Sequence, residues 1–278
     1  MFQFIANIFG YLLEWLYNGI GQNYGIALIL FTIILRIILL PLTIKQQKSM
    51  KKTTELQGKM QEIQFKYKNN PELMNKEIMD LYKRENLSPF SGCISSIVQI
   101  LIILSVFYLV SRPLTYMKKI DPGIIENYRN EISAENDGKI SNYYEIEIIQ
   151  KKAAQDENIK VNMDFLGLDL SKVPSQNMTD IKVYIIPTLY VISSIFSIKM
   201  TTGKTKKKEQ NGSSEPDMTQ QMNKSMSYMM PIMAVSIAFV APLGLALYWL
   251  ISNILMILER IVINKYVDSK EEKTLCLK

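Results

Sequence analysis

The sequence contains no histidine, and only two of its 278 residues are cysteines. The absence of histidine excludes catalytic triads with an imidazole base, imidazole proton shuttles and histidine-ligated metal sites. The two cysteines, Cys93 and Cys276, are too widely spaced for a CxxC metal or redox pair. We therefore expect no catalytic residue, no metal site and no cofactor, and we expect that the protein is not an enzyme.

Charged residues are scarce as well, at 21% of the chain, whereas hydrophobic residues make up 48%. A helix that spans a membrane needs about 20 mostly apolar residues. Five apolar stretches approach that length, and they predict an all-α membrane protein with five transmembrane helices. The stretches run from Tyr24 to Leu42, Cys93 to Val110, Val183 to Ile198, Tyr228 to Val240 and Leu243 to Leu258.

Lysine and arginine are unevenly distributed between these stretches. Residues 1–23 contain none, residues 45–84 contain ten, and residues 199–226 contain six. Basic residues near the ends of spans favour the cytoplasmic side of the membrane. The pattern therefore predicts an outer N-terminus and a cytoplasmic C-terminus.

The stretches and the charges together divide the chain into ten predicted segments. These are an amphipathic helix in the outer membrane interface at 1–22, transmembrane helices at 23–44, 91–112, 183–200, 226–242 and 243–263, a cytoplasmic helical hairpin at 45–90, an extracellular loop at 113–182, a flexible cytoplasmic loop at 201–225 and a cytoplasmic tail at 264–278. The first segment is rich in aromatic and apolar residues, as interfacial helices are. A sixth, uncleaved span is the alternative for it.

The predicted hairpin is two amphipathic helices that meet at Asn69-Asn70-Pro71. Asn70 fits an N-cap, and Pro71 fits the first position of a helix. Apolar residues recur at helical spacing on both sides of this break. One interpretation is that these apolar stripes pack against each other. The other is that the hairpin contacts substrates through adaptable methionines, namely Met60, Met74 and Met79.

Arg36 is the only charged residue in the first apolar stretch, about 13 Å before Lys45 at 1.5 Å per residue. An arginine at mid-membrane costs about 2.5–3.5 kcal/mol on insertion scales. Snorkelling to the surface is one interpretation, but the depth is unfavourable for it. Because no aspartate or glutamate occurs in the other four apolar stretches, we expect a water-filled cavity around Arg36 and no buried salt bridge.

Other polar residues in the spans are expected to line that cavity and to form a hydrophilic groove within the bilayer. Each of them alone is more often a helix–helix hydrogen bond. The predicted groove residues are Arg36, Ser96, Gln99, Ser193, Ser194, Ser252 and Asn253, with Trp249 at the wall.

Four motifs resemble the YidC-type membrane protein insertases, a family shared by bacteria, mitochondria and chloroplasts. The motifs are LRIILLPLTIKQQKSMKK at 35–52, KYKNNPELMNKEIMDLYKRENLSPFSGC at 66–93, FLGLDLS at 165–171 and MMPIMAVSIAFVAPLGLALYWLISNI at 229–254. The second span departs from the family's proline-rich pattern, since it reads GCISSIVQILI. The outer loop also looks longer than is usual in the family, with a polar, acidic insertion around 121–160.

The resemblance implies a five-span insertase and chaperone in the bacterial plasma membrane, with a groove open to the cytoplasm. It implies nascent membrane proteins, the Sec translocon and membrane lipids as partners, a weak ribosome contact through the hairpin or tail, and action as a monomer. Two other classes stay open on the residues alone. One is a small-solute transporter or channel that binds an anion through Arg36, and the other is a structural or signalling scaffold.

Overall fold

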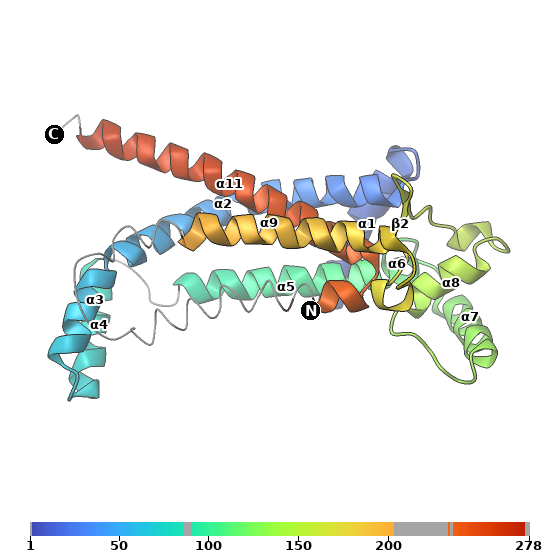
Figure 1. The fold of residues 1–278 in the computed structure, drawn as a ribbon, viewed down its shortest axis with the longest axis horizontal. Coiled ribbons are helices and arrows are strands. Elements are labelled where there is room, and N and C mark those ends of the chain that lie inside the picture. Colours follow the sequence, from blue (N-terminus) through green and yellow to red (C-terminus); the bar gives the residue numbers. More distant parts are fainter. Residues whose placement is uncertain (1, 86–90, 203–232, 234–235, 276–278) are drawn as a thin grey trace.

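The computed structural model describes residues 2–85, 91–202, 233 and 236–275, and most of these residues are helical. Long helices run along the long axis of the molecule, and shorter elements gather at its two ends (Figure 1). The long helices are α2 (Tyr24–Glu55), α5 (Ser91–Ser111), α9 (Ile185–Thr202) and α11 (Leu243–Leu275). The α11 helix packs against α9, α2 and α5. The expected all-α class is confirmed, with one small two-stranded hairpin added to it.

Three helical segments among the described residues are long and apolar enough to cross a membrane. They are Tyr24–Thr53, Ile181–Met200 and Leu243–Ile263, and they coincide with the first, third and fifth predicted spans. The second predicted span coincides with α5, in which Ile97–Ser111 forms a shorter apolar helix. The fourth, at 226–242, lies partly outside the described residues, which include 233 and 236–242 of it. The chain is thus a multi-pass membrane protein, and five spans stay a prediction.

The α2 helix carries the first apolar span directly into the basic segment that follows it. It continues through residue 44, where the sequence analysis placed the end of the span, and ends only at Glu55. No glycine interrupts it between Gly25 and Gly58, and a change in polarity alone does not end a helix. Pro41 lies inside α2, where its ring removes one backbone hydrogen bond and favours a kink.

The first helix, α1 (Phe2–Gly19), packs against α5 and α2. Gly10 allows a close approach, since a Cβ added there would lie 1.9 Å from the carbonyl oxygen of Tyr116. The opposite face of α1 is an apolar stripe with exposed fractions between 52% and 71%. This stripe comprises Phe4, Ile8, Tyr11 and Trp15. It is the surface that an interfacial helix would offer to lipid, and that contact stays a prediction.

One end of the molecule consists of α3 (Gln57–Lys66) and α4 (Pro71–Arg84), which lie side by side (Figure 1). The predicted cap of α4 is confirmed, because Oδ1 of Asn70 accepts a hydrogen bond of 3.1 Å from the backbone N–H of Leu73. Between the two helices, the hydroxyl of Tyr82 donates to the sulfur of Met60 at 3.7 Å. Met60 of α3 and Tyr82 of α4 therefore face each other.

The opposite end is formed by residues 113–184, which we call the connector (Figure 1). Its helical elements are α6 (Pro113–Tyr116), α7 (Pro122–Glu135), α8 (Tyr144–Lys152) and the 3-10 turns η1 (Glu157–Ile159), η2 (Pro174–Gln176) and η3 (Ile181–Tyr184). The predicted extracellular loop is therefore a helical unit in its own right. A fully buried carboxylate lies inside it, since Glu145 accepts from the backbone N–H of Thr115 at 2.9 Å and from its hydroxyl at 2.6 Å.

The FLGLDLS motif covers all but the first residue of a hairpin of β1 (Asp164–Phe165) and β2 (Leu168–Asp169), which pair antiparallel. Leu166 and Gly167 join the two strands with φ angles of 53° and 76°. Positive φ at both central residues is the pattern of a type I′ turn, whose twist suits a two-residue hairpin. The ring of Phe165 fills the space beside Gly25 of α2, where a Cβ would come within 2.5 Å of it.

The chain after this hairpin closes the N-terminus of α11. The backbone N–H of Leu243 donates to the carbonyl of Lys172, and that of Gly244 donates to the carbonyl of Leu170, both at 2.9 Å. The first N–H groups of a helix have no partner within it, and an unpaired backbone group near the bilayer is costly. The motif and the residue that follows it therefore position the start of α11 and accept hydrogen bonds from its first backbone N–H groups. This helix carries much of the candidate site.

Candidate functional site

Arg36 points from α2 toward α11, and its side chain is only 14% exposed. Its Nη2 donates to the backbone carbonyl of Ser252 at 2.9 Å and to the hydroxyl oxygen of the same residue at 3.3 Å. A carbonyl oxygen has two lone pairs, so it can accept from the guanidinium as well as from its own helix. The structure thus brings together two of the predicted groove residues, which lie 216 positions apart in the chain.

The guanidinium also has an acidic neighbour. Its Nη1 lies 3.7 Å from Oε2 of Glu259, whose side chain is 12% exposed. The expectation that Arg36 has no carboxylate partner was wrong, because α11 continues past the apolar stretch that ends at Leu258 and keeps Glu259 in the helix layer. Ser252 and Glu259 are seven residues apart, which is about two helical turns, so they share one face. That spacing was the sequence signal that could have revealed the partner.

Asn253, the next residue along α11, makes a second polar contact on the α9 side. Its Nδ2 donates to the hydroxyl oxygen of Ser193 at 2.8 Å and to that of Ser194 at 3.3 Å. The hydroxyl of Ser193 in turn donates to the carbonyl of Tyr190 at 2.8 Å. These bonds tie α9 to α11, as polar residues commonly do between membrane helices. Three predicted groove residues therefore meet here, in the role of a helix–helix link.

The remaining predicted groove residues are less closely connected. Trp249 packs against Tyr190, with ring centroids 6.3 Å apart and planes inclined at 41°, so it joins the Asn253 contact rather than the Arg36 contact. Gln99 is half-buried on α5, and no hydrogen bond within the described part of the chain joins it to the other site residues. The side chain of Ser96 lies outside the described residues.

The three methionines of the predicted hairpin differ in accessibility. Met60 and Met74 are half-buried between α3 and α4, whereas Met79 on α4 is 43% exposed. Met79 is therefore the methionine most available to another molecule. Contact with substrates stays a prediction for all three.

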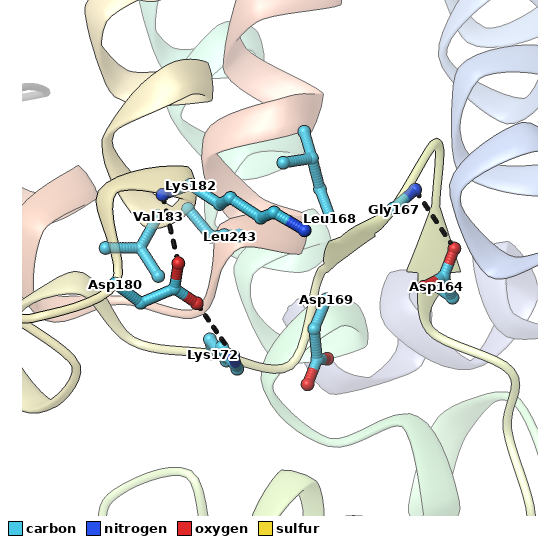
Figure 2. Close-up of a pocket in the computed structure, with 9 residues that line it drawn as sticks. All are labelled: Asp164, Gly167, Leu168, Asp169, Lys172, Asp180, Lys182, Val183 and Leu243. Carbon is cyan, nitrogen blue, oxygen red and sulfur yellow. Dashed lines mark hydrogen bonds and ion pairs between the residues drawn. The ribbon is translucent and has the colours of Figure 1, made fainter.

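Two cavities lie at the connector end of the molecule, and neither is lined by Arg36. The larger, of about 1500 Å³, opens beside α8. The smaller, of about 300 Å³, lies between the β1–β2 hairpin and η3 (Figure 2). At its edge Lys172 Nζ lies 2.8 Å from Oδ2 of Asp180, and this hydrogen bond holds the pKa of the Asp180 carboxyl below its usual range. Among the described residues, no group of acidic residues and cysteines is arranged to hold a metal ion.

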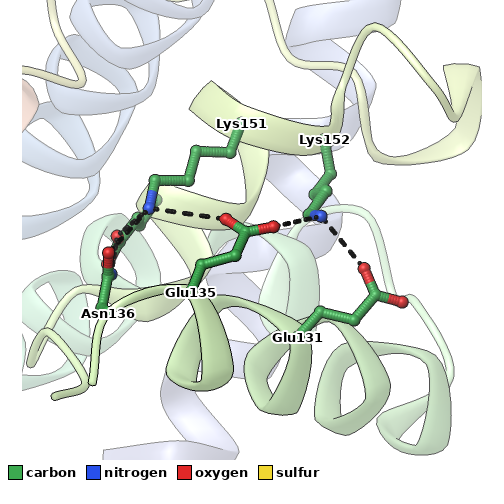
Figure 3. Close-up of polar contacts among 6 residues, drawn as sticks. Glu131, Glu135, Asn136, Lys151 and Lys152 are labelled. Atoms are coloured by element: carbon green, nitrogen blue, oxygen red, sulfur yellow. Dashed lines mark hydrogen bonds and ion pairs between the residues drawn. The ribbon is translucent and has the colours of Figure 1, made fainter. Parts of the chain in front are cut away.

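An ion-pair cluster joins α7 to α8 in the connector (Figure 3). Lys152 Nζ lies 3.0 Å from Oε1 of Glu135 and 3.1 Å from Oε2 of Glu131. The hydrogen bond from Lys152 lowers the pKa of Glu135, and the two carboxylates raise the pKa of Lys152. The neighbouring Lys151 lies 3.0 Å from Glu147 on its own helix. The contact between α7 and α8 thus consists of a buried lysine between two half-exposed carboxylates.

The chain is similar to bacterial proteins named "Membrane protein insertase YidC". It is 29% identical to that of Treponema denticola over 261 residues, which are 94% of this chain and 37% of the relative. It is 28% identical to that of Oceanobacillus iheyensis over 272 residues, which are 95% of this chain and 85% of the relative. A shorter match to that of Clostridium perfringens is 44% identical over 91 residues, 33% of this chain and 38% of the relative.

The chain therefore spans little more than a third of the length of the Treponema denticola relative. The family described as "60Kd inner membrane protein" matches residues 15–271, which include α2, α5, α9, most of α11, the connector and the site around Arg36. With that match over most of its length, the chain belongs to the 60Kd inner membrane protein family, the family of the YidC-type membrane protein insertases.

Proposed function

We propose that this protein is a membrane protein insertase that helps integral membrane proteins enter the bilayer and fold there. The observation that carries the proposal is the buried cluster in which Arg36 meets Ser252 and Glu259 between two apolar helices, in a chain of the insertase family. An ionisable residue inside a membrane helix is costly to keep, and it commonly marks the path of a substrate.

The proposed mechanism follows from what a polar substrate tail loses inside a membrane. Each polar group that leaves water without a new partner costs several kcal/mol in the apolar layer. A groove open to the cytoplasm shortens that dry path, and Arg36 offers N–H donors to carboxylates or carbonyls of the tail. The apolar helix of the substrate then leaves sideways into lipid, without chemical catalysis.

The geometry of the ion pair suits such an exchange of partners. A charge-assisted N–H to carboxylate bond is typically about 2.7–2.9 Å long, whereas Arg36 and Glu259 are 3.7 Å apart. In this arrangement Glu259 offsets the buried positive charge without occupying the guanidinium fully. A substrate carboxylate at bonding distance would compete for Arg36 on favourable terms.

The α3–α4 pair is proposed to receive the nascent chain on the cytoplasmic side, with Met79 as its accessible contact. This placement is supported by the basic residues of 45–84 and by the position of the pair at the end opposite the connector (Figure 1). The connector would then lie outside the cell. The protein would act as a monomer among membrane lipids, alone or beside the Sec translocon, with a weak ribosome contact through α3–α4 or the tail at 264–278.

The test is insertion by the purified protein in liposomes. The substrate is a single-span protein with a short acidic N-terminal tail, and insertion is scored by protection of that tail from protease. Arg36→Ala and Arg36→Lys are compared with wild type, and Arg129→Ala on the connector is the matched control. We expect protection with wild type and the control, loss with Arg36→Ala, and substantial retention with Arg36→Lys, which keeps the charge.

Two other outcomes would change the assignment. Undiminished protection with Arg36→Ala would leave an insertase whose path does not use this arginine. No protection with folded, correctly oriented wild type, with and without added Sec translocon, would reject the insertase assignment. Flux of a small anion that depends on Arg36 would then favour a transporter.

A further inference from the structure

The turn of the β1–β2 hairpin presents an apolar side chain where a polar one is usual. Type I′ turns favour Asn-Gly or Asp-Gly, because both central residues need positive φ. Here the first central residue is Leu166, which has a φ angle of 53° and is 86% exposed. An exposed leucine in a left-handed conformation breaks two local rules at once, which is a mark of a functional position.

A lipid-facing surface leads directly to this turn. The large exposed apolar residues of α9 follow one face at helical spacing, and they are Ile185, Leu189, Ile192, Ile195 and Phe196. One turn before them, Ile181 in η3 is 82% exposed, and the apolar span that includes α9 begins at this residue. The stripe that faces the bilayer along α9 therefore extends into η3 at the end of the span.

The hairpin turn and η3 meet at the smaller cavity. Gly167 of the turn and Lys182 of η3 both line it (Figure 2). Each is preceded in the chain by an exposed apolar residue, Leu166 at 86% and Ile181 at 82%. Exposed apolar residues thus occur on both of the elements that border this polar cavity.

Lys182 supplies a positive charge at the same place. Its side chain extends from η3 toward Leu168 across the cavity (Figure 2), and no carboxylate in the described part of the chain pairs with its ammonium. Three aspartates line the cavity, and each has a hydrogen-bond partner of its own. Asp180 binds Lys172 and accepts from the backbone N–H of Lys182, Asp164 accepts from the backbone N–H of Gly167, and Asp169 accepts from Ser171. The charge of Lys182 acts on Asp180 through space, but its ammonium forms no ion pair with these three carboxylates and is available to an anion from outside the protein.

We propose that this edge docks on the membrane surface and binds a phospholipid there. Leu166 and Ile181 enter the interfacial layer among the lipid chains, and Lys182 binds the phosphate of the headgroup. Continuity with the exposed stripe of α9 identifies lipid, rather than a second protein, as the occupant. A lysine next to an anionic lipid surface contributes about 1 kcal/mol. The proposal rests on the membrane spans alone and does not depend on the insertase assignment.

The first test measures whether the turn touches lipid. A fluorophore sensitive to polarity is attached to Leu166→Cys in the full chain with Cys93→Ser and Cys276→Ser, in vesicles of phosphatidylethanolamine and phosphatidylglycerol. Ile192→Cys on the α9 stripe is the lipid-exposed reference, and Ile140→Cys, exposed on the connector, is the water-exposed reference. We expect Leu166→Cys to show a blue shift and quenching by brominated lipid close to those of Ile192→Cys. Values equal to those of Ile140→Cys would overturn the docking.

The second test measures the lipid contact of Lys182 by native mass spectrometry of the detergent-purified protein titrated with phosphatidylglycerol. We expect Lys182→Met to bind one lipid about fivefold more weakly, the factor equivalent to about 1 kcal/mol, and Lys182→Arg to bind normally. Lys139→Met, at an exposed connector lysine, is the matched control. Equal binding by Lys182→Met and Lys139→Met would reject the site. Inorganic phosphate that competes as well as intact lipid would reject phospholipid as the ligand.

Discussion

Positive side chains meet carboxylates both in the connector and between the membrane spans, and the two sites are built differently. In the connector, Lys152 lies within 3.1 Å of Glu131 and Glu135, whose side chains are 55% and 51% exposed. Between the spans, Arg36 stays 3.7 Å from Glu259, and the two side chains are 14% and 12% exposed. The Lys152 side chain itself is 11% exposed, so the two cations are buried to a similar degree, and the shorter contacts are those with the more hydrated carboxylates.

The comparison shows that distance alone does not rank ion pairs. Water and salt screen an exposed pair, which typically contributes little to stability. A buried pair is weakly screened, so removing one partner leaves an uncompensated charge even if the contact was long. We infer that the connector pairs adjust the position of α7 on α8, whereas the Arg36–Glu259 pair decides whether a cation can remain between the spans.

The largest expected effect comes from reversing the charge of the acidic partner between the spans. Glu259→Lys places two cations side by side in a weakly screened setting. Because breaking a buried pair typically costs about 3–5 kcal/mol, we expect a large drop in stability in lipid nanodiscs, measured by thermal unfolding. Glu135→Lys in the connector is the matched control, for which we expect a clearly smaller drop. Equal drops in the two variants would show that Glu259 is as well hydrated as Glu135.

A smaller effect is expected from the uncharged contact between the spans. Asn253→Leu removes the hydrogen bonds to Ser193 and Ser194, and such bonds contribute about 0.6 kcal/mol on average between membrane helices. We expect a loss of that order, together with faster hydrogen exchange where α9 meets α11. The double variant Ser193→Ala with Ser194→Ala should lose about as much, and adding Asn253→Leu to it should lose little more. Additive losses would mean that Asn253 has another role.

Glu145 of the connector is a buried carboxylate that forms no ion pair within the described residues, so it tests the effect of burial itself. Burial raises the pKa of Glu145 above its usual range, against the hydrogen bonds from Thr115. The folded state therefore holds this proton more tightly than the unfolded state, so stability should fall as pH rises from the usual glutamate range through the raised pKa. Glu145→Gln should remove that fall. Hydrogen exchange of the connector, corrected for the intrinsic effect of pH, measures it.

The control for that experiment is Glu126→Gln, which replaces a carboxylate more than half exposed on α7. It should leave the slope of stability against pH unchanged. A Glu145→Gln variant that keeps the slope of wild type would assign the pH dependence to another group.

The smallest expected effect comes from salt. The screening length falls from about 30 Å at 0.01 M salt to about 3 Å at 1 M. We expect a slight loss of hydrogen-exchange protection where α7 meets α8, and no change around Arg36 and Glu259. A larger change between the spans than in the connector would reverse the comparison on which these predictions rest.

Much of the fold could be predicted from local sequence patterns. Three predicted spans coincide with helices long enough to cross a membrane, because hydropathy is a property of consecutive residues. The cap of α4 at Asn70 was predicted for the same reason, since a cap involves residues three positions apart. The helices of the connector were missed, because their apolar residues alternate with many charges and polar residues.

The candidate site could be predicted only in part. Arg36 and Ser252 stand out as polar residues in apolar stretches, but nothing local indicates that they touch each other. Glu259 was missed because it directly follows the apolar stretch that was searched for partners. Asn253 was assigned to the groove with them, whereas its amide turns toward α9. Adjacent residues on a helix point in different directions, and only the packing of neighbours decides which contact each one makes.

The sequence by itself determined that this chain enters a membrane, which stretches form its long helices and which family it belongs to, because composition, periodicity and motifs are read along the chain. Only the tertiary structure decided that Arg36 faces an acid, that the FLGLDLS motif closes the start of α11, and that the turn of this motif and Lys182 of η3 line the same cavity. Those contacts join residues far apart in the chain, and their energies depend on burial and distance, which arise only when helices pack.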